Sequence, residues 1–85
     1  MTHRTEIGNT VSWSLTHPNY LACDDYDGTS AHYIIDIWDV TTGKTVATCD
    51  NGPTNQALVV AWSPTSGLLA SGGNDSTIQV WNPFP

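Results

Sequence analysis

An internal repeat restricts the fold of this 85-residue chain more than any other feature of its sequence. The tryptophans of a first motif, Trp13 and Trp62, are 49 positions apart, and those of a last motif, Trp38 and Trp81, are 43 apart. A longer loop in the first copy, expected at 24–32, accounts for the difference, because loops absorb insertions at low cost. The sequence therefore predicts two copies of one structural unit. The matching segments are 11–14 with 60–63, 21–23 with 69–71, and 35–39 with 78–82.

Both units have the residue pattern of β-strands. Leu58, Val60 and Trp62 occupy alternate positions, which places them on one face of an expected strand. Residues that favour turns separate such segments, and no stretch of ten or more residues has helical period. We therefore expect an all-β fold of two antiparallel sheets, the second without its outermost strand. The expected strands are 9–14, 20–24, 33–38, 45–49, 57–62, 68–72 and 77–81.

Four short strands per unit, with a third strand that ends in Trp38-Asp39, resemble WD repeats, the blades of β-propellers. The segment 62–81 is a close match to the family pattern, and 7–49 is a more distant one. The resemblance implies one blade at 1–52 and a second, incomplete blade at 53–85. Because propellers close with about four to eight blades, two blades imply an incomplete propeller.

The resemblance also implies a hydrogen-bond network, because a buried tryptophan N–H and a turn carboxylate both need partners. Cys23, His32 and Pro53 depart from the family pattern at three of the positions concerned. The network residues have a structural role in the family and none in catalysis. The residues that match are His3, Trp38, Ser71, Asp75 and Trp81.

The charge balance excludes some classes of partner. Two Lys and Arg residues against eight Asp and Glu give a net charge of −6, whereas binding to nucleic acid or anionic membranes needs clustered cations. The longest apolar run, 57–62, is far shorter than the ~20 residues of a membrane-spanning helix. The first ten residues have no apolar core of a signal peptide, so we expect a cytoplasmic protein.

The sequence does not favour a metal site, a catalytic nucleophile or a phosphate-binding loop. Asp24, Asp25 and Asp27 resemble half of a calcium loop, but Ile34 occupies the position of the essential glutamate, so we expect a solvated acidic loop. The His and Cys spacings match no zinc site, and no nucleophile elbow or phosphate-binding loop is present. We therefore expect no catalytic residue, metal or cofactor. Cys23 and Cys49 are expected as free thiols on the second and fourth strands.

The expected function is that of a non-catalytic scaffold for protein–protein interaction, or of a propeller fragment that self-associates or binds a protein partner to complete the ring. A truncated, non-functional remnant of a larger WD-repeat protein is the alternative. An unpaired last strand is the expected assembly edge, since such edges template pairing with another chain. The two broad faces at the ends of the pair are also expected to be uncovered. The edge residues are Thr77, Ile78, Gln79 and Val80.

Overall fold

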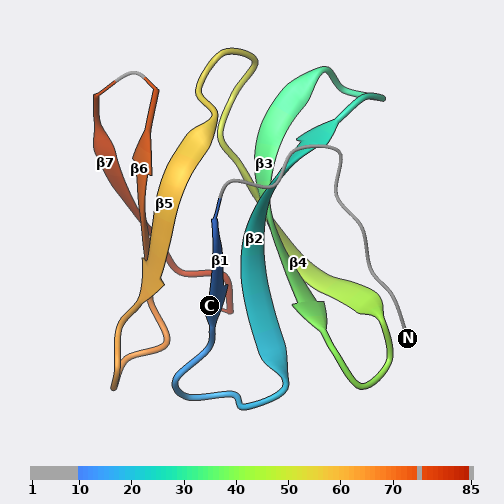
Figure 1. The fold of residues 1–85 in the computed structure, drawn as a ribbon, viewed down its shortest axis with the longest axis vertical. Helices are drawn as coiled ribbons and strands as arrows, with labels where there is room; N and C mark the ends of the chain where they lie inside the picture. Colours follow the sequence, from blue (N-terminus) through green and yellow to red (C-terminus); the bar gives the residue numbers. More distant parts are fainter. Residues whose placement is uncertain (1–9, 75, 85) are drawn as a thin grey trace.

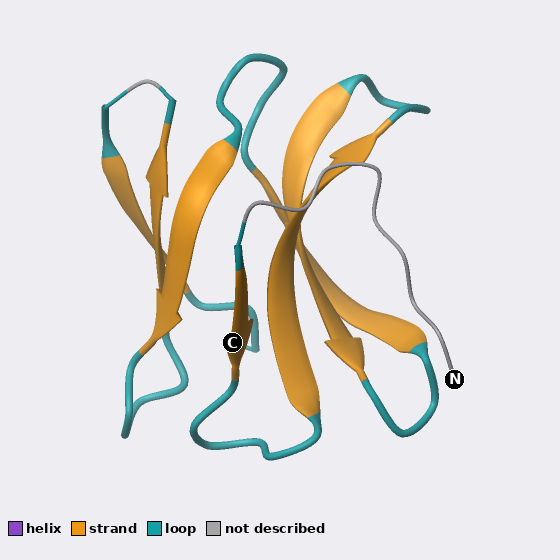
Figure 2. Ribbon diagram, in the orientation of Figure 1, coloured by secondary structure: helices purple, strands orange, loops and turns teal. Residues whose placement is uncertain are grey.

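Seven strands form two antiparallel sheets in the computed structural model, which describes residues 10–74 and 76–84. The first sheet has the order β1-β2-β3-β4 and the second the order β5-β6-β7 (Figures 1 and 2). The expected all-β class, with sheets of four and three strands, is confirmed and agrees with two partial propeller blades. The strands are β1 (Val11–Trp13), β2 (Tyr20–Asp27), β3 (His32–Asp39), β4 (Lys44–Asp50), β5 (Ala57–Trp62), β6 (Leu69–Gly73) and β7 (Ile78–Trp81).

The turns show the same repeat as the sequence. The Ser14 amide donates to the Tyr20 carbonyl at 2.9 Å, and the Ser63 amide donates to the Leu68 carbonyl at 2.8 Å, so both units close their first turn in the same way. Between β3 and β4, Asp39 Oδ1 accepts from the hydroxyl of Thr41 at 2.6 Å and from its amide at 2.8 Å. These hydrogen bonds favour the carboxylate form and hold the pKa of Asp39 below its ordinary value.

The core lies where the two sheets face each other, with β1 beside β5 (Figure 1). Ile35, Ile37 and Leu69 are fully buried there. Trp62 crosses between the sheets, and its indole Nε1 donates to the Ser12 carbonyl of β1 at 3.0 Å. Burial of these side chains is the main favourable contribution to folding, at about 25 cal/mol per Å² of apolar surface.

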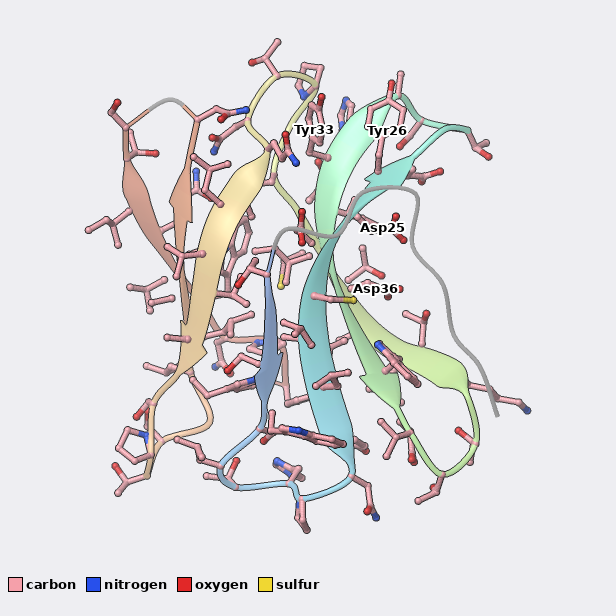
Figure 3. All side chains as sticks on the ribbon, viewed as in Figure 1. Asp25, Tyr26, Tyr33 and Asp36 are labelled. Atoms are coloured by element: carbon pink, nitrogen blue, oxygen red, sulfur yellow. The ribbon has the colours of Figure 1, made fainter. Side chains whose placement is uncertain are left out.

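The prediction of a loop at 24–32 is wrong, because β2 continues to Asp27 and β3 begins at His32. Tyr26 is opposite Tyr33 in this extension, and their rings meet edge to face with centroids 5.0 Å apart. Figure 3 labels both residues near the end of the β2–β3 hairpin. Cross-strand aromatic pairs stabilise a ladder, and this pair favours strand pairing in a segment where aspartate disfavours it. Consequently Asp24 is buried instead of solvated, and its Oδ1 accepts from the Thr10 amide at 2.9 Å.

The prediction that Leu58 shares a face with Val60 and Trp62 is also wrong. Ala57 pairs with Gly73 and Val59 with Gly72, so β5 has one extra residue at this point, a β-bulge. The bulge leaves Leu58 50% exposed and turns Ala57 into the core at 1% exposure. Only the positions after the bulge keep the expected alternation.

Candidate interaction surface

Two of the expected network residues are in direct contact in the second sheet. Trp81 Nε1 donates to Ser71 Oγ at 2.9 Å, and Ser71 is buried on β6. The hydroxyl thus satisfies an indole N–H that lies partly out of water. The expected partners His3 and Asp75 lie outside the described residues, so their roles stay predictions.

The matching positions of the first sheet are occupied differently. Cys23 replaces the serine, and its Sγ lies 3.8 Å from the Asp36 carbonyl oxygen. Burial raises the pKa of the Cys23 thiol to about 11; a hydrogen bond with Trp38 opposes this rise, and nearby aspartates add to it. His32 is at the surface, where its Nδ1 lies 2.9 Å from Asp50 Oδ1. Trp38 thus has the Cys23 thiol as its neighbour, whereas Trp81 has the Ser71 hydroxyl.

The exposed strand at the end of the second sheet is β7. It pairs with β6 and, within residues 10–74 and 76–84, with no other strand. Ile78 is 81% exposed and Val80 is 67% exposed, although both are β-branched apolar residues. Gln79 alternates with them and is half-buried, and the Thr77 carbonyl accepts from the Gly73 amide at 3.2 Å. The strand therefore presents both an open edge and apolar side chains.

These side chains belong to a wider apolar surface, here called the outer face, on the side of the second sheet that faces away from the first. Residues directly opposite in an antiparallel ladder share a face. A Cβ at Gly72 would lie 3.1 Å from Val59 Cγ1, so glycine leaves room for that side chain. A shallow hollow of about 310 Å³ runs along Ala61, Ala70 and Val80. The outer face is formed by Val59, Ala61, Ala70, Gly72, Ile78 and Val80.

No family model matches the chain. The F-box-like/WD repeat-containing protein TBL1X of Mus musculus is 43% identical over 44 residues, which are 52% of this chain and 8% of that protein. TBL1Y of Homo sapiens gives the same identity and shares, and human TBL1X is 41% identical over 44 residues. The chain is related to WD-repeat proteins over about half of its length. The matched segment spans 8% of the length of each of these relatives.

The first sheet has an exposed apolar surface of its own, on the side facing away from the second sheet. Val11 is 62% exposed and Trp13 is 55% exposed, and both lie on β1. Their neighbours on the same face, Cys23 and Asp36, are buried. On β1 the exposed apolar residues of this face are Val11 and Trp13, which we call the β1 patch.

Among the residues that the structure describes, the acidic side chains and thiols do not gather into a metal-binding group. Within residues 10–74 and 76–84, no three or more His, Cys, Asp or Glu side chains are placed to hold an ion. Asp27 accepts instead from the Thr29 amide and the Ser30 hydroxyl, both at 3.0 Å. Cys23 and Cys49 are buried free thiols on β2 and β4, with β3 between them. The same part of the chain has no helix that could cross a membrane.

The sequence alone identified the open strand but not the residues of the two apolar surfaces. The available signal was the apolar run 57–62, in which both alternating sets are apolar. A strand that is apolar on both faces needs cover on both sides. The bulge after Ala57 partly hides that signal, because it changes the face of β5 on which Ala57 and Leu58 lie.

Proposed function

We propose that this chain is a non-catalytic WD-repeat module for protein–protein interaction, which self-associates or docks on a protein partner through its uncovered sheet surfaces. The observation that supports the proposal is the outer face, where Ile78 and Val80 are exposed beside other apolar residues and no charged side chain is present. A contiguous exposed apolar patch marks an interaction site in a soluble protein. Its burial contributes about 25 cal/mol per Å² toward association.

The open edge of β7 offers a second way to bind. An extended segment of a partner can add to such an edge through main-chain hydrogen bonds. Lysine at Gln79 disfavours that pairing, because it carries a charge into the contact. Lysine at Thr65, in an exposed turn, is the matched control for added charge.

The test is the size of the chain in solution, measured by light scattering at tens of micromolar. Discrete oligomers of the wild-type chain are the expected result, and the alternative of a truncated remnant predicts a polydisperse aggregate. A stable, folded monomer contradicts the proposal. A reduction of association by the Gln79→Lys variant, with no change for Thr65→Lys, assigns the contact to the β7 edge.

We also propose the cytoplasm as the compartment of this chain. Cys23 and Cys49 are both unbridged in the fold, and reduced thiols are the rule for cytosolic proteins. Mass spectrometry of protein isolated under thiol-trapping conditions tests the redox state. A mixed disulfide on either cysteine in most molecules contradicts this part of the proposal.

A further inference from the structure

The contact between the two sheets inside the chain provides a template for a contact between chains. On the second sheet, Val60 and Trp62 point inward and are each 6% exposed. On the first sheet, Ile35 and Ile37 point toward them and are 0% exposed. The indole of Trp62 also donates to the carbonyl of Ser12 at 3.0 Å. One tryptophan-bearing strand thus packs on the face of a neighbouring sheet.

The repeat places a counterpart of each of these buried residues at the surface. Trp13, the counterpart of Trp62, is 55% exposed, and Ile78, the counterpart of Ile35, is 81% exposed. The β1 patch therefore corresponds to the inward side of β5, and the outer face corresponds to the inward side of the first sheet. The four matched pairs are Val11 with Val60, Trp13 with Trp62, Ile35 with Ile78, and Ile37 with Val80.

We propose that a second copy of this chain covers the outer face and places its β1 patch where the internal template places β5. This inference rests on the proposed function and names the partner. The hollow beside Ala61, Ala70 and Val80 is the counterpart of the site that Trp62 fills inside the chain. Trp13 of the second copy fills that hollow, and its indole N–H donates to the Ala61 carbonyl, the counterpart of the Ser12 carbonyl.

The two surfaces are compatible in charge and in polarity. The side chains of the β1 patch and of the outer face carry no charge, whereas Asp25 and Asp36 lie beside the β1 patch on the same face of the first sheet. The outer face has Val59 and Gly72 at the positions that Thr10 and Asp24 occupy in the template. It therefore lacks the hydroxyl of Thr10, which accepts from the Val60 amide at 3.3 Å, and is more apolar than the template.

The contact joins two different surfaces, so it is heterologous. Every copy carries one β1 patch and one outer face, and the contact repeats until the assembly closes into a ring or extends as a filament. Salt should strengthen the association, because it screens the repulsion between the acidic chains while the apolar contact remains.

The experiment uses two full-length single variants, Trp13→Lys and Val80→Lys. Each leaves one surface intact and buries an unpaired ammonium group in the other, which weakens association by at least about tenfold. Both side chains are exposed in the single chain, so the fold should tolerate the changes, and far-UV circular dichroism checks it. Mixed in equal amounts, the variants have one intact pair of surfaces and should form a 1:1 dimer.

The mixture distinguishes this inference from the proposed function. Recovery of a dimer by light scattering, with Thr65→Lys assembling like wild type, supports head-to-tail stacking. Failure of the mixture to dimerise, in conditions where the wild-type chain does associate, overturns the stacking and leaves the proposed function intact. A monomeric wild-type chain overturns the stacking together with the self-association on which it rests.

Discussion

The hydrogen bond between Trp81 and Ser71 makes a direct test of the second sheet possible. The Ser71→Ala variant removes the hydroxyl that accepts from the indole of Trp81 at 2.9 Å. Ser71 is 4% exposed, so water does not readily replace the lost hydroxyl. The substitution therefore leaves a partly buried N–H without its acceptor.

The cost follows from the desolvation of that donor. A donor stranded by removal of its partner costs about 1–3 kcal/mol, more than the net value of the bond itself. For a domain of this size, each kcal/mol lowers the melting temperature by roughly 4–8 °C. Ser71→Ala should thus be visible in an ordinary thermal unfolding experiment.

The measurement is urea and thermal unfolding, with the Val80→Lys substitution in every variant so that self-association does not contribute to stability. Ser30→Ala is the matched control, because the Ser30 hydroxyl donates to Asp27 at 3.0 Å but is exposed. We expect the control to cost at most about 0.5 kcal/mol. In a Trp81→Phe background, which lacks the donor, Ser71→Ala should cost much less than in wild type. A cost equal to that of the control, or unchanged by Trp81→Phe, would refute the reasoning.

Three further outcomes are expected. The pKa values of Asp39 and Asp50 are held below 3.8 by hydrogen bonds from adjacent turns, so the free energy of unfolding should fall as pH drops below about 4, and acid titration followed by fluorescence checks this. The pKa of Cys23 is raised from 9.0 to about 11, so stability should decrease as pH rises across that range, and iodoacetamide should modify the thiol slowly until the chain unfolds. Millimolar calcium should leave the melting temperature unchanged, because Asp24 is buried and Asp27 already accepts two hydrogen bonds; a rise of several degrees would contradict this.

Local sequence features predicted most of the strands. The strand at 57–62 was expected at the bounds that the structure has, and the order of strands within each sheet was also expected. Alternation and turn residues act within a few positions, so they are readable without tertiary information. The extension of the β2–β3 hairpin was missed because its stabilising pair, Tyr26 and Tyr33, meets across the ladder and not along the chain.

The candidate site was less predictable than the fold. The open edge at 77–80 was expected from the pattern of three strands in the second unit, and the described residues form those three strands. The outer face did not, because the bulge in β5 separates Ala57, which is buried, from Leu58 and Val59, which are exposed. A bulge depends on the pairing of two strands, and hydrophobic alternation in one strand does not reveal it.

The sequence by itself determined that this chain consists of two similar β-units, because motifs, alternation and turn residues recur in the same order. Only the tertiary structure decided which copy of each repeated residue is buried. Trp62 lies between the sheets and Trp13 at the surface, although their local sequences are nearly the same. The difference arises because burial depends on whether a neighbouring sheet is present, and each end of a two-unit stack has a neighbour on one side only.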